Sequence, residues 1–170
     1  IETQHGERYS KIAAPFLRGV DSETSDQVSD IKKSMVVGDF ESIDGNGLLI
    51  GTALAERLSL SVGDPVAVYS MSLLREVRNV LKKDPSEQNS APLADDYVIE
   101  GIFDIGHYEY NANGMVCSLF NAQDLFSLGN EANGIHVMLN DPEAASEVCE
   151  TLLTQLGPHF LISTWLDRNE

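Results

Sequence analysis

The segment of residues 51–66 constrains the fold more than any other stretch of the chain. Thr52 is predicted to cap a short helix by accepting a hydrogen bond from a free N–H of its first turn. Leu54 and Leu58 are one turn apart and lie on the same face of that helix. The residues that follow predict a tight turn and then the first position of a strand, and they are Gly63, Asp64 and Pro65. No residue of the segment suggests chemistry.

The length and charge of the chain narrow its class. The 170 residues suffice for one domain or two small lobes, and 42% of them are apolar. The net charge of −16 argues against nucleic acid, because phosphate contacts need clustered Lys and Arg, and against binding to anionic lipid. It favours a basic or apolar partner. We find no apolar run of membrane-spanning length and no signal peptide, and the start at Ile1 leads us to expect a larger parent protein.

Apolar spacing predicts several further elements. Residues 8–20 indicate an extended strand broken near Pro15, and residues 25–35 indicate a helix. Residues 97–106 give the clearest strand, with one apolar face and one face that is partly exposed to solvent. The residues assigned to the apolar face are Tyr97, Ile99, Phe103 and Ile105. Further strands are expected at residues 48–50, 66–70 and 115–119, with Asn121 capping the helix after the last of them.

The last third of the sequence predicts a β-α-β unit. Residues 135–139 alternate between apolar and polar positions, as in a strand. Asp141 is a helix N-cap and Pro142 suits the first helical position. The helix ends at Gly157, and residues 160–164 give the closing strand.

Reactive or metal-binding residues form no convincing cluster. His107 and Glu109 have the spacing of two ligands on one strand face, with a solvated strand end as the alternative. The acidic residues near the turn at 44–47 lack the spacing of a calcium loop and indicate a solvated loop. Cys117 and Cys149 lie in apolar patterns, which favours two buried thiols, with a disulfide as the alternative.

Basic residues cluster in the segment 75–83, which holds four of the eleven in this acidic chain. Apolar residues recur there at helical spacing and predict an amphipathic helix over residues 72–83. One interpretation is a helix packed on its own domain with a solvated basic face. The other is a protruding element that docks a partner. Residues 84–96 are polar, contain two prolines and predict a loop.

Six segments, in order along the chain, carry a resemblance to a known family. They are 17–21, 50–66, 97–110, 122–125, 133–141 and 164–169. Together they resemble the periplasmic domain of lipoprotein-releasing ABC transporter permeases of the LolC/LolE type, within the MacB-like superfamily. The second segment matches the central signature of the family, Gly-x-x-Leu-Ala-x-x-Leu-x-Leu-x-x-Gly-Asp-x-Val.

The resemblance implies an α+β fold, the MacB-like periplasmic core domain. A mixed, β-rich Sabre-like lobe would cover residues 1–130, and residues 133–165 would form the second β-α-β half of a Porter-like lobe. We find no counterpart of the first Porter half. Residues 72–95 occupy the place of the Hook, a protruding hairpin that captures a carrier in the LolC type. Here that segment is longer and partly helical in its pattern.

The resemblance also implies a function without catalysis in this domain, and no cofactor or metal. A separate cytoplasmic subunit would hydrolyse ATP, and coupled motion would release a lipoprotein from the inner membrane of a Gram-negative bacterium toward a carrier. The domain itself would lie in the periplasm. The implied partners are the carrier, the lipoprotein, a homologous permease subunit or second copy, and the ATPase subunit. We assign partner contacts to Arg75, Arg78 and Lys82.

Two alternatives to this function remain open. The first is a related export or envelope-regulating permease of the MacB/FtsX type. The second belongs to another class, a small acidic hydrolase that uses the region of His107 and Glu109.

Overall fold

The chain folds into two compact units, described by a computed structural model for residues 11–83 and 94–167. The first unit is Ile1–Gly134 and the second is Ile135–Glu170. Among the described residues, every strand belongs to the first unit. No helix in the described ranges is long and apolar enough to cross a membrane.

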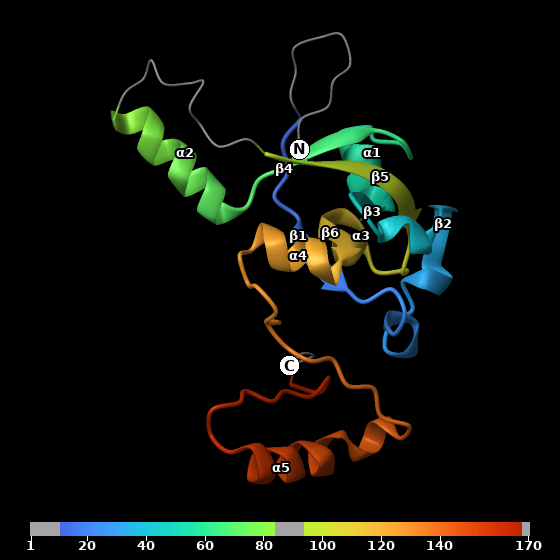
Figure 1. The fold of residues 1–170 in the computed structure, drawn as a ribbon. Coiled ribbons are helices and arrows are strands. Elements are labelled where there is room, and N and C mark those ends of the chain that lie inside the picture. The colour runs from blue at the N-terminus through green and yellow to red at the C-terminus, as the bar shows by residue number, and fades with distance from the viewer. Residues whose placement is uncertain (1–10, 84–93, 168–170) are drawn as a thin grey trace. The chain divides into compact units, whose positions relative to one another are not determined.

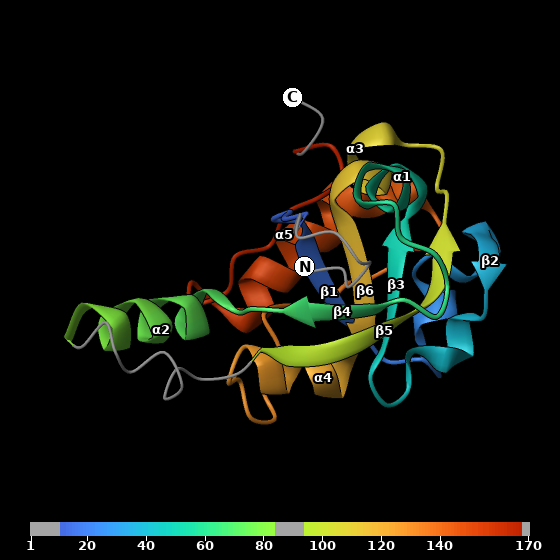
Figure 2. The same ribbon diagram turned by 90° about the horizontal axis from the view of Figure 1, so that it is seen from above.

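The first unit is built on a mixed six-stranded sheet (Figure 1). Its order is β1-β6-β3-β5-β2, and β4 pairs with β5 beside this path (Figure 2). The pairs β1–β6 and β3–β5 are parallel, and the others are antiparallel. The strands are β1 Phe16–Val20, β2 Met35–Gly38, β3 Gly47–Gly51, β4 Pro65–Val68, β5 Asp95–Phe103 and β6 Gly114–Ser118. The expected α+β class is confirmed.

Five α-helices lie within the described ranges, four in the first unit and one in the second. They are α1 Thr52–Leu58, α2 Met71–Lys83, α3 Tyr108–Asn113, α4 Leu119–Leu125 and α5 Ala145–Leu156. Short 3-10 turns occupy Ser25–Gln27, Lys32–Ser34, Phe40–Ile43 and Pro142–Ala144. Helix α3 was not expected from the sequence, because its six residues are too few to show a helical period.

The two faces of the sheet pack against two separate apolar cores. Strand β3 shows this most clearly, since Leu48 and Ile50 point into one core and Leu49 into the other. All three side chains are fully buried. The expected strand at 48–50 is therefore an unbroken apolar run, as is typical of a strand that is covered on both faces.

A β-bulge in β5 corrects the expectation for that strand. Leu48 pairs with Ile99, but Leu49 pairs with Gly101, so Glu100 is an extra residue in the ladder. The extra residue reverses the alternation of side chains. Tyr97 and Ile99 consequently face one core, whereas Phe103 and Ile105 face the other. The prediction that these four residues share one face is wrong.

Residues 52–66 form α1, a turn and the start of β4, as predicted. The predicted cap is wrong, because the extended N-cap residue is Gly51 and no side-chain bond caps the helix. Thr52 is already the first helical residue. Gly51 also abuts α3, since an added Cβ there would lie 2.2 Å from the carbonyl oxygen of Asn111.

Residues 25–35 do not form the single helix that was predicted. They form two 3-10 turns and the first residue of the unpredicted strand β2. Between the turns the hydroxyl of Ser29 accepts from the N–H of Ile31 at 3.4 Å, a local bond that competes with helical hydrogen bonding. The β-branched pair Val36-Val37 then favours the strand, which pairs with β5.

The cap of α4 also differs from the prediction. Ser118 is the N-cap, and its hydroxyl accepts from the N–H of Asn121 at 3.2 Å. Asn121 is instead buried inside the helix, where its side-chain amide donates to the carbonyl of Gly45. It thereby joins α4 to the turn before β3.

The second unit contains the expected helix but not the expected strands. Asp141 accepts from the N–H of Glu143 at 3.0 Å, with Pro142 next to it, and the helical segment ends at Gly157. Residues 135–139 and 160–164 have no regular secondary structure and no ladder partners among the described residues. A parallel pair alone is not stable without further strands beside it, so the alternating pattern produced no sheet. The β-α-β half expected over residues 133–165 is therefore present only as its helix.

Two thiols are free in the structure. Cys117 is fully buried on β6, as the apolar pattern predicted, and Cys149 is half-buried on α5. Burial raises the pKa of the Cys117 thiol to about 12. Burial, with a smaller effect of Cys117, likewise raises the pKa of the Tyr97 hydroxyl to about 12.

Gly51→Ala should destabilise the first unit by about 2 kcal/mol, since the added methyl group meets the backbone of Asn111 and overpacks the contact of α1 with α3. Urea unfolding followed by circular dichroism measures the change. Gly134→Ala is the matched control, because an added Cβ there has no neighbour within 4 Å. Equal stability of the two variants would contradict the close approach at Gly51.

The free energy of unfolding should fall as the pH rises above about 9. The thiol of Cys117 ionises near pH 9 in the unfolded chain but only near pH 12 in the folded one, so unfolding releases a proton in this window. The fall is at most about 1.4 kcal/mol per pH unit for one such group. Cys117→Ala should remove most of the fall between pH 9 and 10, where Tyr97 contributes the smaller part, whereas Cys149→Ala should retain it. An unchanged slope in Cys117→Ala would refute this origin.

Candidate functional site

The connection between β4 and β5 is much longer than the fold requires. The two strands are antiparallel neighbours, and Val68 pairs with Asp95. Two to five residues suffice to join such a pair. Here residues 69–94 intervene, and they contain the whole of α2. The connection is therefore an insertion in a hairpin, and insertions of this kind are commonly functional.

Helix α2 is attached to the sheet at its N-terminal end. Ser70 is buried, and its hydroxyl accepts from the N–H of Leu73 at 3.2 Å. The carbonyl of Ser70 accepts from the N–H of Leu74 at 3.0 Å. Beyond this anchor α2 extends away from the sheet in both views (Figure 1; Figure 2). We call α2 the arm.

The arm carries the three residues that the sequence singled out. Positions 75, 78 and 82 are spaced i, i+3, i+7 and therefore share one face of the helix. Arg75 and Arg78 are exposed there. Lys82 lies in the last turn of the arm, and its side chain falls outside the described residues. The predicted helix and its basic face are thus confirmed as elements of structure, whereas the partner contact remains a prediction.

The arm has the opposite charge to the rest of the chain. Residues 71–83 hold four basic residues and one acidic residue, a net charge of +3 in a chain of −16. The remaining residues therefore carry −19. Such a contrast attracts an acidic surface to the arm and makes the attraction dependent on salt.

An apolar groove of about 420 Å³ lies at the base of the arm. Its walls come from the segment before β1, from β1, β4 and β6, from the start of the arm and from the end of α4. Several lining side chains are well exposed, including Ile12 at 82%, Met71 at 66% and Leu74 at 44%. The size falls within the range of about 300–1,000 Å³ that is usual for binding pockets. The groove and the arm form the candidate site.

The sequence alone did not identify this groove. Its lining residues are separated by up to 114 positions, from Ile12 to Phe126, and only the sheet brings them together. The available signal was the alternation of Met71 and Leu74 with basic residues at the start of the amphipathic helix. That signal indicates exposed apolar groups but not the walls opposite them.

The region of His107 and Glu109 does not have the expected geometry. His107 is the N-cap residue of α3 and Glu109 lies inside that helix, so the two do not share a strand face. Within the described residues, no group of three or more His, Cys, Asp or Glu could hold a metal ion. Tyr110 packs edge-on against His107, with ring centroids 5.5 Å apart.

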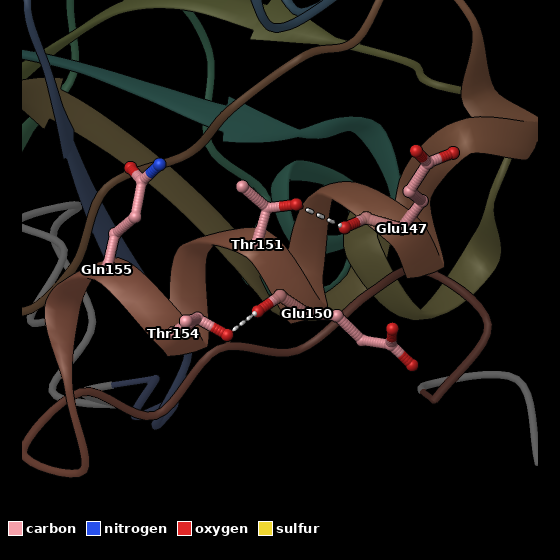
Figure 3. A pocket seen from close by; sticks show the side chains of 5 residues that line it. All are labelled: Glu147, Glu150, Thr151, Thr154 and Gln155. Atoms are coloured by element: carbon pink, nitrogen blue, oxygen red, sulfur yellow. Dashed lines mark hydrogen bonds between the residues drawn. The ribbon is translucent and has the colours of Figure 1, made fainter.

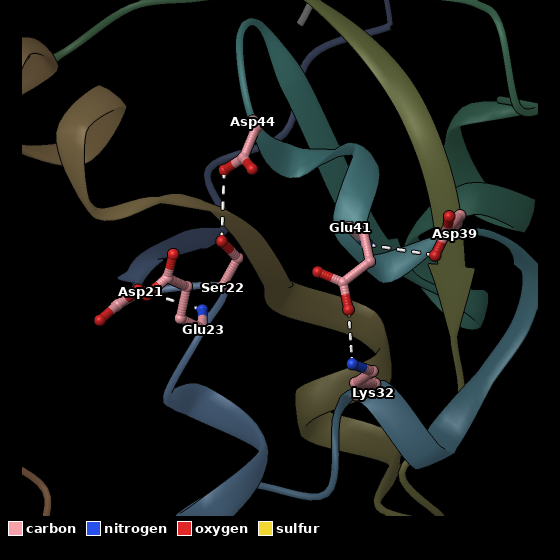
Figure 4. A network of polar contacts seen from close by, with 7 residues as sticks. All are labelled: Asp21, Ser22, Glu23, Lys32, Asp39, Glu41 and Asp44. Carbon is pink, nitrogen blue, oxygen red and sulfur yellow. Dashed lines mark hydrogen bonds and ion pairs between the residues drawn. The ribbon is translucent and has the colours of Figure 1, made fainter.

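The acidic residues near the turn at 44–47 make local structural bonds (Figure 4). Asp39 accepts from the N–H of Glu41 at 3.2 Å and caps a 3-10 turn. The Glu41 carboxylate pairs with Lys32, and Asp44 accepts from the hydroxyl of Ser22 at 3.4 Å. These partners account for the cluster without a bound cation.

A second depression lies on one face of α5 (Figure 3). Its hydroxyl groups are committed to the helix, since Thr151 donates to the carbonyl of Glu147 at 3.0 Å and Thr154 to that of Glu150 at 2.9 Å. All five lining residues come from this one helix. A single helix face does not enclose a ligand, so we assign no site here.

Comparison with known proteins assigns no family. No family model matches the chain, and no curated protein is significantly similar to it. The resemblance to lipoprotein-releasing permeases therefore rests on the six sequence segments.

Proposed function

We propose that this chain is the non-catalytic periplasmic domain of an ABC transporter permease that releases lipoproteins from the inner membrane. The parent protein would couple ATP hydrolysis in a cytoplasmic subunit to transfer of the lipoprotein to a periplasmic carrier. In this proposal the Sabre-like lobe is the first unit and the arm takes the place of the Hook. A homologous subunit or a second copy would complete the permease.

The observation that carries the proposal is the basic arm inserted into the β4–β5 hairpin. The fold closes without it, because Val68 and Asp95 are already paired. The insertion places basic residues of the arm on one exposed face, in a chain that is otherwise strongly acidic. Charge of this kind speeds the encounter with an acidic partner and selects against basic ones.

The mechanism requires a stiff link between the sheet and the arm. Strand β4 is held along β5 by a four-residue antiparallel ladder, and buried Ser70 ties the end of β4 to the first turn of the arm. A displacement of the sheet is therefore passed to the arm, and no reactive side chain is needed. The domain would act by docking and by transmitting motion.

Reversing the arm charges should weaken capture of the carrier. The variant Arg75→Glu, Arg78→Glu, Lys82→Glu should weaken retention of a periplasmic lipoprotein carrier at least about tenfold, because it replaces attraction by repulsion on the docking face. A pull-down with the immobilised domain at low salt measures the effect. At ~0.5 M salt the unmodified domain should also retain less carrier, because salt screens the attraction.

The control variant makes the same change of charge elsewhere. Lys11→Glu, Lys32→Glu, Lys33→Glu alters exposed residues of the body and should retain the carrier. Loss of the Lys32 and Lys33 ion pairs costs little, since exposed pairs contribute about 0–1 kcal/mol. Equal retention by the arm variant and the unmodified domain would refute the docking role of the arm.

A further inference from the structure

The groove and the basic face of the arm form one continuous surface. Met71 lines the groove and is also the first residue of the arm. Positions 71, 75, 78 and 82 are spaced i, i+4, i+7, i+11, and therefore follow one stripe along the helix. The stripe leads from an apolar side chain in the groove to Arg75, Arg78 and Lys82. A ligand in the groove is thus directed along the basic stripe.

The groove itself is suited to an apolar anchor. Met71, Leu74, Ile12 and Phe126 keep between 42% and 82% of their surface exposed. Covering such side chains is favourable by about 25 cal/mol for each Å² removed from water. The exposed methionine side chain at position 71 can adapt its shape to different partners. The groove therefore provides apolar contact area but little selectivity for one shape.

The length of the basic stripe indicates which kind of ligand follows the anchor. From Met71 to Lys82 the stripe covers eleven helical steps, or about 16 Å, and from Arg75 to Lys82 about 10 Å. A lipid with one anionic headgroup can meet only one end of this stripe. A polypeptide can place several carboxylates along it. The spacing of the charges thus favours a polypeptide.

We propose that the groove and the basic stripe together bind an acidic polypeptide segment with an apolar anchor at one end. Two or three apolar side chains occupy the groove between Ile12, Met71 and Leu74. The acidic residues that follow run along Arg75 and Arg78 toward Lys82. The inference rests on the proposed function only in taking the arm as a docking element, and it names the chemistry of what docks there.

A synthetic peptide tests the inference directly. The probe is a fluorescein-labelled 14-residue peptide with the anchor Leu-Phe-Leu, followed by glutamates at every third or fourth position. The control peptide carries glutamine at those positions. Fluorescence anisotropy with the whole domain should show saturable binding of the acidic peptide. The glutamine peptide should bind with an affinity at least about tenfold lower. Absence of saturable binding, or equal binding of both peptides, would overturn the proposal.

Variants of the groove distinguish specific binding of the anchor from nonspecific binding to apolar surface. The double variant Met71→Asn, Leu74→Asn should weaken binding of the acidic peptide at least about tenfold, since both side chains contact the anchor in this proposal. The matched control, Val36→Asn with Val62→Asn, changes apolar residues that are 59% and 39% exposed and do not line the groove. The control should bind within about twofold of the unmodified domain. Equal weakening by both pairs would overturn the groove as the anchor site.

Lipid binding is the competing outcome. Laurate and phosphatidylglycerol vesicles are titrated in parallel, and binding of either at the groove without peptide binding would overturn the inference in favour of a lipid site. If the peptide does not bind but the domain still captures the carrier in a charge-dependent way, this inference alone is wrong. Peptide binding without carrier capture would remove the proposed transporter role alone.

Discussion

Strand β5 is the constraint on which the first unit depends. It pairs with β3 on one side, and with β2 and β4 along other parts of its length. The bulge at Glu100 lets this one strand supply Ile99 to one core and Phe103 to the other. Gly101 has no side chain, so Met35 and Leu49 close over it. The sheet can therefore be buried on both faces although several of its strands are only four or five residues long.

The same strand determines where the candidate site lies. Because β4 lies antiparallel to the first half of β5, the chain leaves and re-enters the sheet at one place. Apart from buried Ser70, the residues of the range 69–79 belong to neither apolar core. The arm is anchored through Ser70 and exposes its arginines to solvent. The walls of the groove are side chains of the sheet, of its flanking segments and of the start of the arm. The sheet and the arm thus meet at the groove.

The sequence predicted what depends on neighbours along the chain. The turn at Gly63, the start of β4 at Pro65, the amphipathic arm and the Asp141 cap all follow from local rules and were correct. Three local predictions were wrong, namely the caps at Thr52 and Asn121 and the single helix over residues 25–35. The remaining errors concern long-range pairing. The bulge at Glu100 depends on β3, and residues 135–139 have strand alternation but no ladder partner among the described residues. The basic face was predicted from helical spacing alone, whereas the groove needs walls from distant segments.

In the proposed function the arm meets a carrier protein during lipoprotein release. A photo-reactive phenylalanine at position 78 of the proposed parent permease, irradiated in membranes that contain its ATPase subunit and the carrier, tests for this contact. We expect a crosslinked adduct with the carrier, and a much weaker one when the same probe replaces Tyr108, an exposed residue of α3 outside the arm. Equal adducts from both positions, or none from position 78, would contradict it.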